Sequence, residues 1–338
     1  MSFGELHDEL RVVARDLLGK ASAPDWRLLA DAGWPGLEVP ESLGGAGATF
    51  AEVAVVLEEM GRATTSSPYL GTAVLGVGAL GLLEPSRGRD DLLRRAAAGD
   101  LRLAVALPTG DDPAIPFRIE RRRRLHGRAE LVPDASDAEV LLLPAVDRDG
   151  TPVVVTARAV EVIDQPVLDA TRRFGVVSAD GVEVDEVWRF AGDPGAAVQR
   201  LLDRAALAIA CDSLGLSEAM LDATVAYAGV RQQFGRPIGS FQAVKHACAD
   251  MLVHIAVARE LIATAVHDDT PAAVSMAKSY ATGTAVDVVG KALQLHGGIG
   301  YTWESGIHAY LKRAALNRSL FGSPRAHRRR LAERYPRC

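Results

Sequence analysis

Two stretches in the last third of the chain carry most of the information about its fold: Arg231-Gln-Gln-Phe-Gly-Arg-Pro-Ile-Gly239, followed by Ser240-Phe241-Gln242, and Gln294-Leu-His-Gly-Gly-Ile-Gly-Tyr301. Each follows a long run with helical spacing of apolar residues. A cation beside glycines, where backbone approaches a ligand without an intervening Cβ, is typical of phosphate binding. Taken singly, however, each stretch is equally typical of a helix end or a connection between helices.

The sequence around these stretches predicts a helical bundle. Four long helical segments are expected, at about 197–230, 241–267, 271–296 and 303–334. Because short connections containing Gly and Pro join them, we expect neighbouring helices to run antiparallel, as in a four-helix bundle.

The residue pattern of the rest of the chain changes near residue 100. The N-terminal part is helical in pattern; in Thr49–Arg62, for example, Phe50, Val53 and Met60 fall on one face. Residues 101–195 instead contain short β-rich runs separated by turns, among them LRLAVAL, TPVVVTARAV and FGVVSADGVEV. The sequence therefore predicts an α+β fold with an N-terminal helical domain (1–100), a middle antiparallel β-sheet or barrel domain (101–195) and a C-terminal four-helix bundle (196–338).

Composition excludes several classes of function. The 338 residues carry a net charge of -5, which does not suit nucleic-acid binding. The three cysteines, Cys211, Cys248 and Cys338, form no disulfide framework or metal-ligand pattern, so we expect a reducing, cytoplasmic location and no metal. The longest apolar stretch, 69–83, is too short to span a membrane. The basic run Arg121–Arg124 predicts a solvated loop or strand edge, or else a docking patch for an anionic ligand or partner.

Together the two C-terminal stretches resemble the paired "RxxFGxPI…FQ" and "QxxGGxGY…E" signatures of the acyl-CoA dehydrogenase family. The segment PESLGGAG (40–47), followed by a helix ending in EEMGR (58–62), is similar to the family as well. The resemblance spans nearly the whole chain and is weakest in the middle. It implies the family's three-part fold and its cofactor, FAD.

In the family, these motifs bind the FAD of the neighbouring subunit. The resemblance implies that Arg231 donates to a phosphate and that Phe234 packs on the cofactor's rings. It also implies hydrogen bonds from glutamines and close backbone approach at glycines. The expected cofactor-binding residues are Arg231, Phe234, Gln242, Gln294, Gly297 and Gly298.

The family's reaction removes the α-proton of an acyl thioester, which needs a carboxylate as base. Family members carry the catalytic Glu at one of two positions, and here these positions hold Phe321 and Ala205. No acid occurs within 318–327, so a small misalignment does not supply one. Asp203 is a weak candidate near the second position, and Glu304 matches a glutamate whose family role looks structural. The sequence therefore predicts no catalytic residue in this chain.

The middle domain departs from the family pattern too. A "TEP…GSD" segment and a "W-I-[ST]-N" strand normally surround the flavin ring. Here the first position reads ALPTGD (106–111), and the second has no match where the chain runs RLHGRAELVPDAS (124–136). The resemblance thus implies that the flavin-ring half of the site is degraded while the half offered to a neighbour is intact.

A single hypothesis accounts for the missing catalytic Glu, the altered flavin-ring segments and the intact C-terminal motifs. The chain resembles the shorter, non-catalytic subunit of α2β2 acyl-CoA dehydrogenases of actinobacterial steroid degradation, and the run HAYLKRA (308–314) is similar to that subgroup. This implies a longer catalytic homologue as partner, an acyl-CoA (a sterol side-chain thioester) at the partner's site, and electron-transfer flavoprotein as acceptor. One alternative is a self-sufficient homo-oligomer using an unrecognised base such as Asp203. Another is a structural or regulatory partner that binds no flavin.

Overall fold

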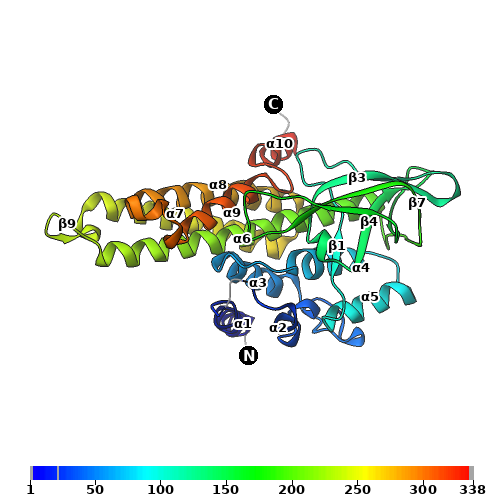
Figure 1. The fold of residues 1–338 in the computed structure, drawn as a ribbon, viewed down its shortest axis with the longest axis horizontal. Coiled ribbons are helices and arrows are strands. Elements are labelled where there is room, and N and C mark those ends of the chain that lie inside the picture. Colours follow the sequence, from blue (N-terminus) through cyan, green and yellow to red (C-terminus); the bar gives the residue numbers. More distant parts are fainter. Residues whose placement is uncertain (1–2, 21–22, 335–338) are drawn as a thin grey trace. The chain divides into compact units, whose positions relative to one another are not determined.

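A computed structural model describes residues 3–20 and 23–334 of the chain (Figure 1). The described residues form two compact units. The bundle unit takes its residues from Met1–Ser22, Ala54–Thr65 and Ile209–Cys338, and the sheet unit from Ala23–Val53 and Ser66–Ala208. Since neither unit is one continuous segment, the division into three consecutive domains stays a prediction.

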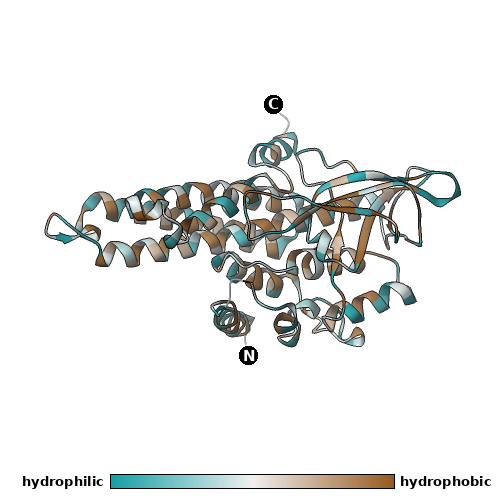
Figure 2. Ribbon diagram, viewed as in Figure 1, coloured by the Kyte–Doolittle hydropathy of each residue, from teal (hydrophilic) through white to brown (hydrophobic). Residues whose placement is uncertain are grey.

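The bundle unit is built from long helices in the order that the sequence predicts. They are α6 (Pro194–Val230, in this unit from Ile209), α7 (Gln242–Asp268), α8 (Pro271–His296), α9 (Ile307–Ser319) and α10 (Pro324–Arg334), with α1 (Phe3–Leu18) and the end of α3 (Phe50–Arg62). The predicted helix 303–334 is broken at 320–323, because Phe321 and Gly322 adopt positive φ angles of 54° and 93°. Brown and teal residues alternate along α6, α7 and α8, as expected of helices with one buried face (Figure 2).

Small residues bring the helices of this unit into close contact. A Cβ at Gly61 of α3 would lie 2.0 Å from the Asp212 carbonyl oxygen of α6, and one at Gly215 would lie 1.7 Å from the Glu58 carbonyl oxygen. Only glycine allows backbone to approach backbone this closely. On α8 the buried face is mostly Ala, Ser, Thr and Val, which allows similarly close packing.

A buried polar network lies inside the bundle unit. Arg313 donates to both carboxylate oxygens of Asp212, at 3.2 Å from Nε and 2.8 Å from Nη2, and also to the Thr65 carbonyl at 2.8 Å. Asn317 donates to the same carboxylate at 2.7 Å. Asp212 is 1% exposed and Arg313 2% exposed, so the pair is desolvated and fully bonded.

The sheet unit contains an eight-stranded sheet with the order β6-β7-β3-β2-β4-β5-β8 and with β1 beside β4. The strands are β1 (Leu103–Val105), β2 (Phe117–Ile119), β3 (Arg124–Pro133), β4 (Val140–Val146), β5 (Pro152–Thr156), β6 (Glu161–Asp164), β7 (Phe174–Glu183) and β8 (Glu186–Trp188). Its helical elements are α2 (Trp26–Asp31), η1 (Trp34–Gly36), η2 (Glu41–Leu43), η3 (Leu70–Gly76), α4 (Val77–Gly81), α5 (Arg87–Ala97), η4 (Arg121–Arg123) and η5 (Ala135–Asp137), with the first residues of α6. A core of Phe117, Leu125, Leu143, Val155 and Val177 holds the strands together.

The α+β class and the helix–sheet–helix order along the chain are confirmed. The middle sheet, however, is mixed rather than purely antiparallel: β4 pairs in parallel with both β1 and β2. The alternation of apolar residues identifies a strand but not its neighbour, so the sequence did not reveal these two parallel pairs. No helix within the described residues is long and apolar enough to cross a membrane.

Candidate cofactor half-site

The first C-terminal motif forms a tight hairpin at the end of α6. Strands β9 (Gln232–Gln233) and β10 (Arg236–Pro237) pair in antiparallel fashion, and the Ile238 N–H donates to the Arg231 carbonyl at 2.8 Å. The two turn residues, Phe234 and Gly235, have φ angles of 53° and 77°, as a type I′ turn requires. The hairpin therefore fixes Arg231 at the junction between helix and turn.

The two motifs meet at one hollow in the bundle unit, with a volume of about 370 Å³. Its lining residues are Tyr227, Arg231, Gln233, Ile238, Leu295, His296, Gly297, Gly298 and Ile299. The Tyr227 ring stacks on His296 with centroids 4.5 Å apart, and the Tyr227 hydroxyl donates to the His296 carbonyl at 3.3 Å. This contact ties the end of α8 to the end of α6, so that Arg231 and the glycine turn face the same space.

The hollow suits a phosphate group. Arg231 is exposed and forms no ion pair with any residue in the part of the chain that the structure describes, so its guanidinium retains its charge and donors. Gly297 has φ 62° and ψ -141°, and a Cβ at Gly297 or Gly298 would meet nothing within 4 Å. The Gly297 N–H already donates to the Gln294 carbonyl, so the charged donors come from the unpaired Arg231 guanidinium, and the two glycines leave room for a phosphate beside it. These residues therefore fit the phosphate part of FAD.

The other predicted cofactor residues lie outside the hollow. Phe234 is 92% exposed at the tip of the hairpin, with its ring edge-to-face with Phe241 at 6.1 Å. Gln242 begins α7 after η6 (Ile238–Ser240), and Gln294 is on the last turn of α8; both are exposed. The structure thus groups Arg231, Gly297 and Gly298, and the roles of Phe234, Gln242 and Gln294 stay predictions.

Sequence reasoning missed Tyr227 and His296. Tyr227 precedes Arg231 by four residues, so the two side chains lie on one helix face. This spacing could have indicated Tyr227 as a site residue. His296 is 8% exposed, and its Nδ1 lies 2.8 Å from the Ala292 carbonyl oxygen. Nothing in the sequence distinguishes such a histidine from an ordinary core residue.

The two positions expected to hold a catalytic Glu are buried and apolar. Phe321 is 4% exposed, and its carbonyl lies 3.0 Å from His327 Nε2. Ala205, on α6, is fully buried. Asp203 is 5% exposed and accepts a hydrogen bond from Gln199 at 2.9 Å. Glu304, in η8 (Trp303–Ser305) after η7 (Gly297–Tyr301), is fully exposed, and hydrogen bonds with its own backbone and Thr302 lower its pKa, as expected of a solvated carboxylate rather than a base.

The segments that replace the flavin-ring motifs use polar groups within the sheet unit. The Thr109 hydroxyl donates to the Glu130 carbonyl at 3.3 Å, and the Leu131 N–H donates to the Gln165 side chain at 2.6 Å. The Asp134 carboxylate accepts from the Gly71 N–H at 2.8 Å. These three groups are bonded within the sheet unit, and the loss of the surroundings of the flavin ring stays a prediction.

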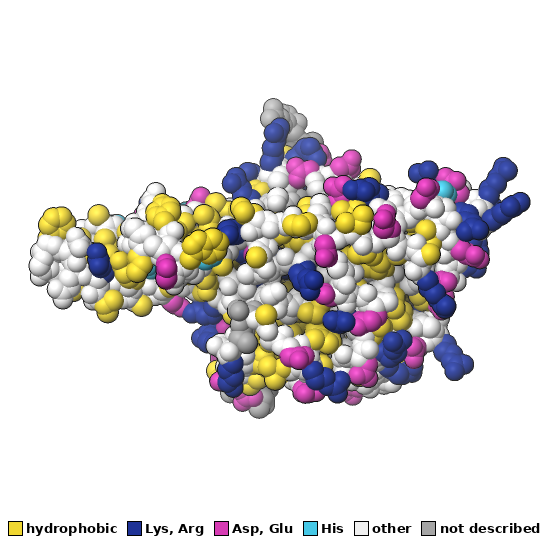
Figure 3. Space-filling model, viewed as in Figure 1, with side chains coloured by type: hydrophobic (Ala, Val, Ile, Leu, Met, Phe, Trp, Pro, Cys, Tyr) yellow, Lys and Arg dark blue, Asp and Glu magenta, His cyan; other side chains and the backbone are white. Residues whose placement is uncertain are grey.

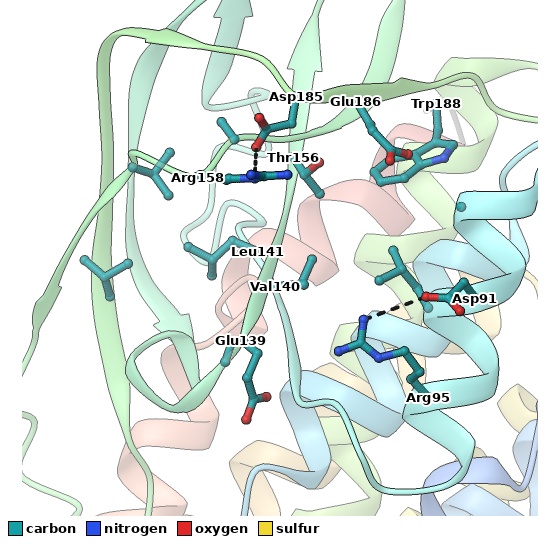
Figure 4. Close-up of a pocket in the computed structure, with 16 residues that line it drawn as sticks. Asp91, Arg95, Glu139, Val140, Leu141, Thr156, Arg158, Asp185, Glu186 and Trp188 are labelled. Carbon is teal, nitrogen blue, oxygen red and sulfur yellow. Dashed lines mark ion pairs between the residues drawn. The ribbon is translucent and has the colours of Figure 1, made fainter.

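Another cavity, of about 640 Å³, lies between α5 and the strands β4, β5 and β8 (Figure 4). Its floor includes Leu141 and Trp188, and its rim carries the ion pairs Asp91–Arg95 at 3.7 Å and Arg158–Asp185 at 3.6 Å. It contains no residue that the sequence assigned to the cofactor or to catalysis.

Family profiles match most of the chain. "Acyl-CoA dehydrogenase, C-terminal domain" matches residues 195–335 and "Acyl-CoA dehydrogenase, N-terminal domain" matches residues 6–99. The chain belongs to the acyl-CoA dehydrogenase family. It is 35% identical over 310 residues to the acyl-CoA dehydrogenase IpdE2 of Mycobacterium tuberculosis, a match covering 90% of this chain and 85% of that protein. Members of this family depend on FAD.

Solved structures of heteromeric members have the same fold. The Tcur3481-Tcur3483 steroid ACAD G363A variant matches with a TM-score of 0.88 and 30% identity, over 98% of both chains. The ChsE4-ChsE5 complex from Mycobacterium tuberculosis matches with a TM-score of 0.86 and 25% identity, again over 98% of both chains. Within residues 3–20 and 23–334, no group of three or more His, Cys, Asp or Glu side chains could hold a metal ion.

Proposed function

We propose that this chain is a subunit of a heteromeric, FAD-dependent acyl-CoA dehydrogenase. In this assembly it supplies the phosphate-binding half of a cofactor site and contributes no catalytic base. The observation that carries the proposal is the unpaired Arg231 guanidinium, which faces the same hollow as the uncovered backbone of Gly297 and Gly298. The apolar side chains at positions 321 and 205 support the second part, because neither can accept a proton.

The surface around the hollow supports a partner chain. Exposed apolar side chains gather on this end of the bundle unit, where Figure 3 shows yellow patches: Val230, Phe234, Leu252, Val253, Val257, Ile299, Tyr301 and Trp303. A concentration of exposed apolar side chains is typical of an interaction surface. A longer acyl-CoA dehydrogenase homologue in an α2β2 assembly would cover it, and the two heteromeric relatives support a partner of that kind.

The division of labour follows from the residues present. Arg231 would donate to a phosphate oxygen, Phe234 would pack against the cofactor's rings, and Gln242 and Gln294 would hydrogen-bond to it. FAD, when bound, supplies the hydride acceptor. The base that removes the substrate's α-proton and the surroundings of the flavin ring would come from the partner. The substrate would be an acyl-CoA, with a sterol side-chain thioester as the specific candidate, and electron-transfer flavoprotein would reoxidise the complex.

The competing functions find less support. A self-sufficient enzyme would need Asp203 as its base, yet this carboxylate is buried and bonded to Gln199. A flavin-free structural role leaves Arg231 without a function, although it is placed beside two uncovered glycines. The flavin-free alternative predicts that replacing Arg231 leaves the flavin content of a complex unchanged. The self-sufficient alternative predicts stoichiometric FAD in the lone chain and loss of activity in an Asp203→Asn variant.

The test is the affinity of the complex for FAD. The chain is co-expressed with a longer homologue that retains the catalytic Glu, and Arg231→Ala is compared with Arg259→Ala. Arg259 is a matched control because its guanidinium is already paired with Glu218 at 2.6 Å and does not line the hollow. Loss of a charge-assisted hydrogen bond should weaken FAD binding by about 10-fold or more in the Arg231 variant and by less than about twofold in the control. Equal FAD affinity in both variants would refute the proposal.

A further inference from the structure

A second cationic site lies at the far end of the sheet, where β2 turns into β3. Dark blue side chains gather at the end of β3 and β7 in Figure 3. A hollow of about 670 Å³ in this region is lined by Ile119, Glu120, Arg121, Arg124, His126 and Arg148. Three of these six side chains are arginines, from two separate loops, and one is an acid. The chain as a whole is acidic, so this concentration of positive charge is local.

The arginines of the hollow are held in place without being neutralised. Arg124 donates to the Gly181 carbonyl at 3.0 Å, and Arg148 donates to the Glu120 carbonyl at 3.3 Å. Across the described ranges, none of Arg121, Arg124 and Arg148 forms an ion pair. A carbonyl orients a guanidinium but does not cancel its charge, and each guanidinium has five N–H donors, so most donors remain available. The Glu120 carboxylate is itself paired with Arg118 at 2.9 Å.

The arginines are presented by the tight turn between β2 and β3. Arg122 and Arg123 adopt φ angles of 59° and 56°, as residues in the turn of a tight hairpin commonly do. The Glu120 N–H donates to the Arg124 carbonyl at 2.7 Å and closes the turn. Arg121 and Arg124 therefore leave the backbone on either side of one fixed turn.

The positive surface is compact rather than extended. An adjoining hollow shares Ile119, Glu120 and Arg148 with the first one and is also lined by Arg122, Arg123, Asp147, Asp149 and Val187. The carboxylates of Asp147 and Asp149 would repel an acidic polypeptide that continued beyond the first hollow. A short, multiply charged anion therefore fits better than an acidic protein segment, and the fork geometry of arginine matches phosphate oxygens.

We propose that the hollow formed by Arg121, Arg124 and Arg148 is a binding site for the phosphate group of a small molecule. It is made only of residues in the sheet unit and shares none with the half-site at Arg231. Arg121 supplies a guanidinium for which the described residues provide no hydrogen bond or ion pair, and Arg124 and Arg148 line the hollow beside it. The run Arg121–Arg124 is thus a docking patch for an anion, the second of the two interpretations that the sequence left open.

The test uses inorganic pyrophosphate and the full-length chain carrying Arg231→Gln, which removes the other phosphate site. Isothermal titration calorimetry compares Arg121→Gln/Arg148→Gln with Arg128→Gln/Arg173→Gln. The control pair removes two exposed arginines from the same unit, paired with Glu130 and Asp137, that do not line the hollow. We expect one pyrophosphate per chain, about 10-fold weaker binding in the first double variant and less than a twofold change in the control.

Several outcomes would overturn this inference. They are the absence of saturable binding in the Arg231→Gln chain, and equal weakening in both double variants. A parallel titration with hexaglutamate separates a phosphate site from a surface for acidic protein segments. If hexaglutamate binds more tightly than pyrophosphate, the ligand is not a small phosphate and the proposal is wrong.

Discussion

Arg313 and Arg231 belong to the same bundle unit, yet their surroundings are opposite. Arg313 is 2% exposed and donates to both oxygens of Asp212, whereas Arg231 is exposed and pairs with no carboxylate among the described residues. A buried charge must be paired, so Arg313 is explained by folding alone. An unpaired charge at a hollow is not needed for folding and is available to a ligand, which is the role proposed for Arg231. The two arginines thus differ in what their surroundings require of them.

The largest expected effect concerns the buried network. Replacing Asp212 with Ala leaves the Arg313 guanidinium buried without its counter-charge, which should lower the free energy of unfolding by about 3–5 kcal/mol. Denaturant unfolding of the chain measures this loss. Asp222→Ala serves as control, because Asp222 pairs with Arg62 at an exposed site and should cost less than about 1 kcal/mol. Similar losses in the two variants would mean that burial does not distinguish the pairs.

Glu58 is an intermediate case, in which burial and pairing compete. Burial raises the pKa of Glu58 to about 7, although Arg11 donates to it at 3.1 Å. The folded state therefore holds this proton more tightly than the unfolded state. Its contribution to stability is complete below the ordinary pKa of 4.5 and is lost as the pH rises to about 7, by up to about 3 kcal/mol.

Unfolding measurements at pH 4.5 and pH 7.5 check this prediction. The stability of the unmodified chain relative to Glu58→Gln should fall between the two pH values, because the amide does not titrate. Glu9→Gln, at an exposed position of α1, should show no such difference. A relative stability that rises with pH would show that the ion pair with Arg11 outweighs burial.

Phe321→Glu tests whether the missing base alone explains the expected inactivity. The side chain is 4% exposed in a turn with φ 54°, so a carboxylate there should cost about 2 kcal/mol of stability. We expect no acyl-CoA oxidation by the lone Phe321→Glu chain, because under the proposal the surroundings of the flavin ring come from the partner. Phe321→Leu is the control for loss of the phenyl ring of Phe321. Turnover of acyl-CoA by the lone Phe321→Glu chain would show that only the base had been lost.

The smallest expected change in stability is at Arg231. Since its side chain is exposed and has no ion pair among the described residues, Arg231→Ala should change the free energy of unfolding by less than about 0.5 kcal/mol. The same substitution is expected to weaken FAD binding in the complex, so the two measurements should diverge. A large loss of stability would mean that Arg231 is part of the fold, like Arg313.

The sequence predicted the helices of the bundle well. Pro271–His296 was bounded correctly because Thr270 caps its N-terminus and Gly297 ends it, both local signals. It did not predict the β9–β10 hairpin, because Phe at a positive φ is not an ordinary turn signal, nor the parallel neighbours of β4, which depend on long-range pairing. At the candidate site, Arg231 and the glycines carried a recognisable pattern, and Tyr227 stands four residues before Arg231. His296 became evident only when the helix ends were seen together.

The central claim is that a cofactor site is divided between two chains, and flavin stoichiometry tests it most directly. The chain is purified alone and together with a longer homologue, and absorbance near 450 nm is compared with protein content. The account predicts a colourless, inactive chain alone and about one FAD per pair of chains in the complex. A lone chain that is yellow with stoichiometric FAD and oxidises an acyl-CoA would contradict it.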